Sequence, residues 1–139
     1  MPRVEDVMTR GVITISQDAS VEEVMKTMVE RHVSSIIVQK SSDDDVYGIV
    51  TRKDIISRVF SRGDDVKKLK VADVMSKPVM TITPQMDAVA AAKLMDKTNV
   101  RRFPVMENEK LIGIISNSDI FRAYVIDNII SRENKKTKK

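Results

Sequence analysis

The chain has 139 residues, 42% of them hydrophobic, enough for a packed core in one compact domain or two small ones. It contains no cysteine, which excludes disulfide frameworks, thiolate metal sites and thiol nucleophiles. The formal net charge of +4 equals that of residues 132–139 alone, so the rest of the chain is neutral overall. Because no apolar run approaches the roughly 20 residues that span a bilayer, and the first residues form no signal region, we expect a soluble, cytoplasmic protein.

The first half of the chain predicts a strand, a helix, two strands and a second helix. VITI at 12–15 is a short strand rich in β-branched residues. The next segment is a helix with a serine cap, because Ser20 precedes apolar residues at i, i+3, i+4 and i+7. Two further strands are VSSIIV at 33–38 and VYGIV at 46–50, joined by a polar hairpin, and the second helix contains IISRVF at 55–60.

The same order of elements returns in the second half. A strand at VMTI, 79–82, precedes a helix that Asp87 caps. The next two strands are VRRFPV at 100–105, in which Pro104 favours an edge or a strand end, and LIGII at 111–115. The last helix contains IFRAYVIDNII at 120–130.

These two halves are copies of one unit. Residues 4–38 align with residues 71–105 without a gap, so that VEDVM lies on VADVM. Two extra residues lie in the first hairpin, where insertions are tolerated. We therefore predict a tandem duplication: repeats at 1–61 and 71–130, a charged linker at 62–70, and a basic disordered tail at 131–139.

One motif recurs near the end of each repeat, as GIVTRKD at 48–54 and GIISNSD at 113–119. The hydroxyl and the aspartate three residues later form a variant of the helix capping box, which needs no ligand. The same helix start offers free N–H groups to a phosphate, and its carboxylate suits a ribose diol. The leading Gly48 and Gly113 allow a close approach of backbone or ligand, or mark a bend. The residues alone leave these interpretations open.

The ordered set of motifs, found twice over residues 3–127, resembles a tandem CBS domain pair, or Bateman module, of the stand-alone kind common in archaea. The resemblance implies an α/β fold of two β-α-β-β-α repeats related by pseudo-twofold symmetry. It implies a regulatory module without cofactor, which binds AMP, ADP or ATP in a cleft between the repeats and signals by conformational change to an unknown partner. S-adenosylmethionine is the family's alternative ligand. A homodimer is expected.

The resemblance also implies that each site combines the aspartate-bearing helix of one repeat with strands of the other. One site would join Thr51, Lys53 and Asp54 to Ile82, Thr83, Pro84, Val100, Arg101, Arg102 and Pro104. The other would join Ser116 and Asp119 to Ile15, Ser16, Val33, Ser34 and Ser35. Since arginine suits phosphate, we expect the Asp54/Arg102 site to be the tighter, unless one of the two arginines points to solvent and the other makes a surface ion pair.

Other candidate sites are weaker. His32 is the only histidine and lies at a predicted helix end, as surface or cap residues do. Neither GxxxxGK[ST] nor GxGxxG occurs, and Asp43–Asp45 form an acidic hairpin tip that we expect to be solvated rather than metal-bound. Without a nucleophile–base pair we expect a binder and no enzyme. The alternative from another class is a nucleic-acid-associated protein that uses the basic tail.

Overall fold

The computed structural model describes residues 2–137 and divides into two compact units. The first-repeat unit is Ile13–Val79, and the second-repeat unit combines Met1–Val12 with Met80–Lys139. Each unit mixes helices and strands, which confirms the α/β class. The units therefore differ from the sequence repeats at their leading segments.

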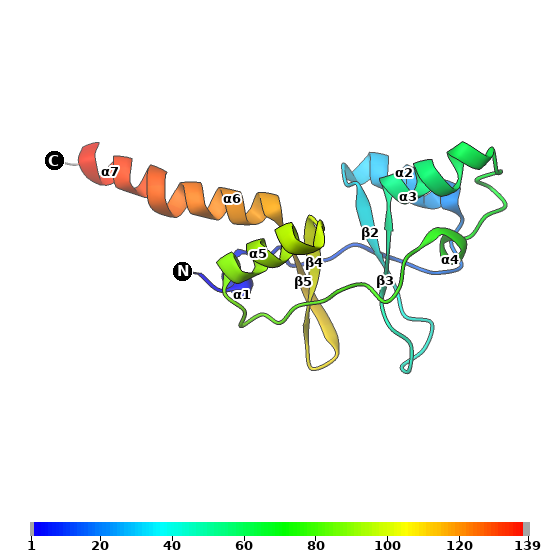
Figure 1. Ribbon diagram of the computed structural model, residues 1–139, viewed down its shortest axis with the longest axis horizontal. Helices are drawn as coiled ribbons and strands as arrows, with labels where there is room; N and C mark the ends of the chain where they lie inside the picture. Colours follow the sequence, from blue (N-terminus) through cyan, green and yellow to red (C-terminus); the bar gives the residue numbers. More distant parts are fainter. Residues whose placement is uncertain (1, 138–139) are drawn as a thin grey trace. The chain divides into compact units, whose positions relative to one another are not determined.

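The first-repeat unit contains a three-stranded sheet in the order β1-β2-β3. The strand β1 (Thr14–Ile15) runs parallel to β2 (Ser35–Val38), which pairs antiparallel with β3 (Gly48–Thr51). Its helices are α2 (Val21–Arg31), α3 (Arg52–Arg58), the 3-10 turn η1 (Phe60–Arg62) and α4 (Val71–Val74). Figure 1 shows α2 and α3 beside this sheet.

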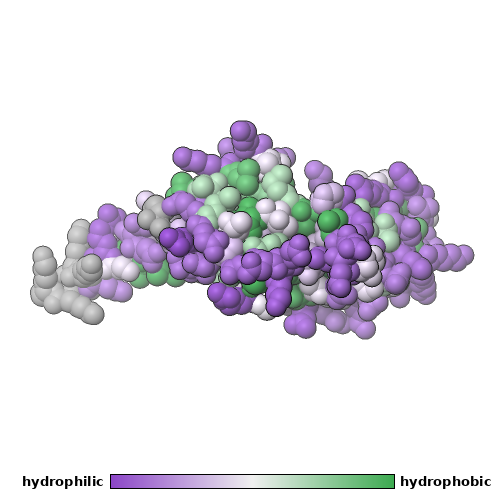
Figure 2. Space-filling view, turned by 90° about the horizontal axis from the view of Figure 1, so that it is seen from below, coloured by the Kyte–Doolittle hydropathy of each residue, from purple (hydrophilic) through white to green (hydrophobic). Residues whose placement is uncertain are grey.

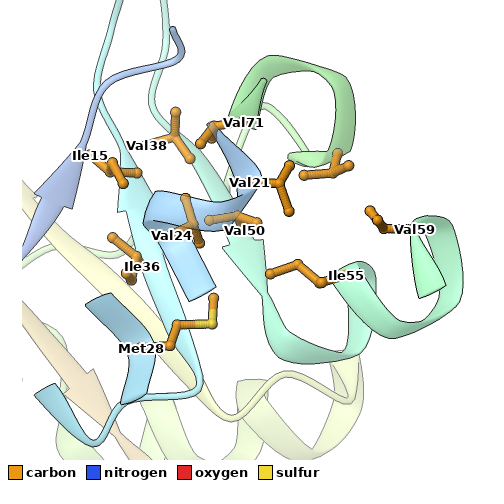
Figure 3. Close-up of a cluster of buried hydrophobic side chains, with 11 residues drawn as sticks. Ile15, Val21, Val24, Met28, Ile36, Val38, Val50, Ile55, Val59 and Val71 are labelled. Atoms are coloured by element: carbon orange, nitrogen blue, oxygen red, sulfur yellow. The ribbon is translucent and has the colours of Figure 1, made fainter. Parts of the chain in front are cut away.

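The core of this unit is aliphatic. The apolar stripe of α2 is buried through Val21, Val24 and Met28. It packs with side chains of all three strands, as Figure 3 shows for Ile36, Val38 and others. Burial of such side chains stabilises the fold by about 1.5–3 kcal/mol each.

The second-repeat unit repeats this plan with a sheet of two strands instead of three. Its strands β4 (Arg102–Glu107) and β5 (Lys110–Ser116) pair antiparallel. The predicted strand at 79–82 is reduced to one parallel bridge, between Ile82 and Val105. The helices are α1 (Val4–Val7), α5 (Ala88–Thr98), α6 (Asn117–Val125), the π-helical η2 (Ile126–Ile130) and α7 (Ser131–Thr137).

Pro104 lies inside β4, opposite Ile114, rather than at a strand end. Its carbonyl accepts a hydrogen bond from the Ile82 N–H at 3.1 Å. The nitrogen of Pro104 therefore faces the segment around Ile82 and not β5. Its missing N–H removes no hydrogen bond between β4 and β5.

The leading segments of the two repeats are exchanged. The Val4 N–H donates to the Met86 carbonyl at 2.8 Å, which holds α1 on the second-repeat unit. At the equivalent positions, the Val71 N–H donates to the Ala19 carbonyl at 2.8 Å, which holds α4 on the first-repeat unit. Each unit is thus completed by the short helix that begins the other sequence repeat.

The glycine that leads each motif lies against one of the exchanged segments. A Cβ on Gly48 would lie 3.0 Å from the carbonyl oxygen of Ser76, and a Cβ on Gly113 would lie 3.0 Å from that of Thr9. Both neighbours belong to the segments that follow α4 and α1, and both form antiparallel bridges beside the glycines. The close approach that the glycines permit is therefore one of backbone to backbone.

The helix boundaries follow from local chemistry. Ser20 and Asp87 accept backbone N–H bonds at the starts of α2 and α5, which confirms both predicted N-caps. His32 ends α2 as its left-handed C-cap, with φ of 56°, so it is a cap residue. In residues 2–137 no helix is both long and apolar enough to cross a membrane.

The C-terminal segment differs from the expectation of a disordered tail. Residues 131–137 form α7, which continues the helix that begins with α6 through η2. Extending an existing helix avoids the unfavourable nucleation step that a separate short helix would need. The last two residues of the predicted tail, 138 and 139, lie outside the described residues.

Candidate functional site

The first motif caps α3 and leaves one carboxylate oxygen unoccupied. The Thr51 Oγ1 accepts from the Asp54 N–H at 3.0 Å and donates its own proton to Asp54 Oδ2 at 2.8 Å. Among residues 2–137, Oδ1 of Asp54 makes no hydrogen bond. The capping prediction is thus confirmed here, and the carboxylate keeps an acceptor for another group.

The second motif closes a full capping box at the start of α6. The Ser116 Oγ accepts from the Asp119 N–H at 3.1 Å, and the Ser116 N–H donates to Asp119 Oδ2 at 2.9 Å. The Oδ1 atom of Asp119 lies 3.5 Å from both Thr9 Oγ1 and Arg122 Nη1. Asp119 is only 8% exposed, so this carboxylate is occupied by its own unit.

Two substitutions between the repeats explain this difference. Arg122 corresponds to Ser57, whose short side chain donates instead to the Asp54 carbonyl at 3.4 Å. Thr9 corresponds to Ser76, which makes no side-chain bond to Asp54 in the described structure. The two S/T-x-x-D motifs are therefore alike in sequence and unequal in accessible acceptors.

A serine pair lies next to the first motif. Ser35 is the Cα partner of Thr51 across β2 and β3, and the Arg52 N–H donates to the Ser34 carbonyl at 2.8 Å. The Oγ atom of Ser35 is buried and has no hydrogen-bond partner in the described structure. Leaving a buried hydroxyl unpaired costs about 1–3 kcal/mol, so this atom needs an explanation.

An arginine pair occupies the equivalent place beside the second motif. Arg102 is the Cα partner of Ser116, and the Asn117 N–H donates to the Arg101 carbonyl at 2.9 Å. Burial lowers the pKa of Arg102 below its ordinary value, while the charge of Asp119 opposes that shift. The guanidinium remains charged at neutral pH, so a partly buried cation lies near this helix start.

The predicted residues are distributed over the two units of the structure. Thr51, Lys53 and Asp54 share the first-repeat unit with Ile15, Ser16, Val33, Ser34 and Ser35. The second-repeat unit holds Ser116, Asp119, Ile82, Thr83, Pro84, Val100, Arg101, Arg102 and Pro104. The combination of these residues across the repeats, which the resemblance implies, stays a prediction.

Sequence reasoning missed several polar contacts beside these groups. Asp45 belongs to the hairpin that we expected to be solvated, yet its carboxylate binds Lys77 at 2.6 Å and Gln17 at 2.8 Å. The contact of Arg122 with Asp119 has the i, i+3 spacing of one helix face and was visible in the sequence. The contact of Thr9 with Asp119 had no such signal, because it depends on the exchanged segment.

Comparison with known proteins decides the family. The sequence profile of the CBS domain matches residues 4–61 and again residues 71–126. The chain belongs to the CBS domain family. It is a tandem CBS pair, and the resemblance found in its motifs is confirmed.

Several curated relatives share this region. An uncharacterised protein of Methanopyrus kandleri is 34% identical over 120 residues, which are 86% of this chain and 61% of the relative. A mitochondrial CBS-domain protein of Arabidopsis thaliana is 30% identical over 78% of the chain and 54% of its own length. This CBS pair therefore spans less than two thirds of the length of these relatives. The CBS-domain protein YhcV of Bacillus subtilis, 30% identical, is covered over 84%.

Solved structures of CBS-domain proteins are similar to this chain in fold. The hexameric CBS-CP12 protein of bloom-forming cyanobacteria is 35% identical, with a TM-score of 0.81 over 91% of this chain and 75% of the other. A CBS-domain protein of Agrobacterium tumefaciens is 27% identical, with a TM-score of 0.78 over 87% and 98% of the two chains.

Proposed function

We propose that this CBS pair is a regulatory module that binds an adenine nucleotide at its S/T-x-x-D helix starts. The observation that carries the proposal is that the first-repeat unit leaves two polar groups unsatisfied, one from each of the two expected sites. Asp54 keeps a free carboxylate oxygen, and Ser35, on the strand beside Thr51, has a buried hydroxyl without a partner. A ribose offers the donors that a carboxylate accepts, and a nucleotide offers acceptors for a hydroxyl.

The arginine pair supports an anionic ligand. Burying the guanidinium of Arg102 is unfavourable, and a phosphate that accepts its bidentate hydrogen bonds offsets that penalty. The proposal retains the expectation that Arg102 acts together with Asp54. A site with both groups would bind a phosphorylated ligand more tightly than the site that relies on Ser34 and Ser35.

A regulatory role is supported by the architecture of relatives. Homoserine O-acetyltransferase of Methanococcoides burtonii is 37% identical to this chain, but the match covers only 23% of that enzyme. Inosine-5'-monophosphate dehydrogenase of Korarchaeum cryptofilum matches over 24% of its length. The shared part is a CBS pair, so the proposal gives this chain no catalysis. A ligand would signal by its different affinity for two conformations, which a partner protein distinguishes.

The proposal includes a homodimer. Ile56 in α3 and Phe121 in α6 are equivalent in the two repeats, and both are more than half exposed, at 51% and 72%. A duplicated apolar surface of this kind favours association with a second copy. The cyanobacterial CBS-CP12 relative is hexameric, which also supports oligomerisation.

Calorimetric titration tests the ligand. AMP, ADP, ATP and S-adenosylmethionine are titrated into the full chain and into Asp54→Asn, Asp119→Asn and Arg102→Ala. Asp44→Asn is the matched control, because it removes one exposed carboxylate outside the motifs. The proposal expects saturable binding of one nucleotide that Asp54→Asn weakens at least about tenfold and that the control leaves unchanged.

The other outcomes are decisive too. S-adenosylmethionine binding that is insensitive to Arg102→Ala would replace the nucleotide with the family's alternative ligand. No binding of any of the four ligands, together with unchanged thermal melting, would make both motifs helix caps only. Unchanged nucleotide affinity in Arg102→Ala would remove the proposed difference between the sites.

A further inference from the structure

The helix at the C-terminus carries an apolar stripe that its own unit leaves uncovered. Ile126, Ile129 and Ile130 are 46%, 37% and 44% exposed and follow the i, i+3, i+4 spacing of one helix face. The main packing partners of η2 are the helices on either side of it in the chain, α6 and α7. Figure 1 shows this helix leaving the remainder of the second-repeat unit, and Figure 2 shows hydrophobic surface along it.

Such a stripe is unfavourable in a free chain. Partly exposed isoleucines forgo part of the stabilisation that full burial would give, and the stability of a protein helix comes mostly from packing of its apolar face. By contrast, α6 is held by its contacts with α5, α1 and β5. The stripe therefore requires a partner surface.

We propose that Ile126, Ile129 and Ile130 form an antiparallel helix pair with the same stripe of a second copy of this chain. In a twofold pair each stripe packs against the same stripe of the other copy, so the contact buries six isoleucines, three from each chain. This inference rests on the homodimer in the proposed function and assigns its contact to the C-terminal helix. It is independent of nucleotide binding.

Charge favours this occupant and this direction. Residues 132–139 carry a net charge of +4, so parallel helices would place two strongly basic ends side by side. Antiparallel helices separate these ends and place the Arg132 end of each helix along the Asp127 end of the other. Residues 127–133, along the stripe, carry two acidic side chains and one basic side chain, whereas a helix that lies on an anionic membrane has a basic polar face.

The test measures association of the full chain by sedimentation over a dilution series. Ile129→Glu places a charge in the stripe and is expected to raise the dimer dissociation constant at least about tenfold. Val29→Glu is the matched control, because Val29 is 75% exposed on α2, in the other unit. Both positions are exposed, and circular dichroism shows whether each variant keeps its fold.

The relative direction of the two helices is measured with one spin label on each chain, which the absence of native cysteine permits. A label at Ser118→Cys lies ten residues before the centre of the stripe. An antiparallel pair separates the two labels by about 30 Å along the axis, whereas a parallel pair leaves them about 10 Å apart.

Each outcome is informative. Loss of dimer in Ile129→Glu but not Val29→Glu, with the long label distance, supports the proposal. A dimer that survives Ile129→Glu overturns the assignment to this helix and leaves the homodimer standing. Binding of anionic vesicles or nucleic acid that Ile129→Glu abolishes overturns the assignment of the stripe to a second copy. A chain that is monomeric throughout overturns both the assignment and the homodimer, while the nucleotide titrations stand by themselves.

Discussion

The Nζ atom of Lys77 lies 2.6 Å from Oδ1 of Asp45, across 32 residues of chain. The other carboxylate oxygen accepts from Gln17 Nε2 at 2.8 Å and from Ser41 Oγ at 2.8 Å. The hydrogen bond from Lys77, followed by those from the backbone N–H groups of Ser41 and Val46 and from the Ser41 hydroxyl, holds the pKa of Asp45 far below its ordinary value of 3.8. One carboxylate thus connects the β2–β3 hairpin, the segment after β1 and the segment after α4.

The stability of the first-repeat unit should depend on pH through Asp45. Because the folded-state pKa lies below the unfolded one, the ionised carboxylate stabilises the fold fully above about pH 4. That contribution is lost as the pH falls below 4 toward the folded-state value. We expect Asp45→Asn to lower the urea midpoint at pH 7, and the difference from the natural chain to shrink at pH 3.

The neighbouring Asp44→Asn is the control for this measurement, since Asp44 is exposed at the same hairpin tip. It should leave the urea midpoint unchanged at both pH values. An equal effect of the two substitutions would mean that hairpin charge, rather than the bond to Lys77, governs the pH dependence.

Gly113→Ala should destabilise the second-repeat unit by about 1–3 kcal/mol. The new Cβ would lie 2.6 Å from Met8 Sδ and 3.0 Å from the Thr9 carbonyl oxygen. Thermal melting of Gly113→Ala, Met8→Ala and the double variant separates these contacts. Because the Met8 side chain is removed, the glycine substitution should be less harmful in the double variant. A full penalty there would assign the whole effect to the backbone contact with Thr9.

The two motif aspartates should differ in stability without any ligand. Asp119→Ala removes the acceptor of the Ser116 N–H and should cost about 1–2 kcal/mol. Asp54→Ala removes only the bond from the Thr51 hydroxyl and should cost less than about 1 kcal/mol. Chemical unfolding in nucleotide-free buffer ranks them, and the reverse order would contradict the difference in capping described above.

Ser35→Ala should be neutral or stabilise the free protein by about 1 kcal/mol, because it removes a buried hydroxyl without a partner. Ser34→Ala removes the neighbouring hydroxyl and is the control for the stability measurement only, because Ser34 belongs to the same predicted site. If the proposed nucleotide satisfies the Ser35 hydroxyl, the same substitution should weaken its binding while melting improves. Destabilisation of the free chain by Ser35→Ala would show that the hydroxyl has a partner in solution.

The elements with strong local patterns were predictable. The stripe after Ser20 and the cap at Asp87 specify α2 and α5, because periodicity and capping act within a few residues. The four-residue helices α1 and α4 were missed, since they are too short to show a period. The strand expected at 79–82 became a single bridge, because pairing depends on the neighbouring strand rather than on β propensity alone.

The candidate site was predictable at the level of motifs. The S/T-x-x-D pattern located both helix starts, and its capping chemistry is local. The inequality of the two motifs was not foreseen, because Thr9 reaches Asp119 from 110 residues away. Likewise the buried state of Ser35 depends on the packing around β2, which a run of two serines does not reveal.

The exchanged leading segments have a consequence for how the duplication arose and how the chain is divided. A single-repeat ancestor would complete its fold by swapping the α1-type helix with a second molecule, and fusion of two such molecules reproduces the present connectivity. Neither half, cut at the repeat boundary, retains the helix that closes it. Two fragments, residues 1–61 and 62–139, should therefore fold when mixed rather than apart, as an obligate heterodimer.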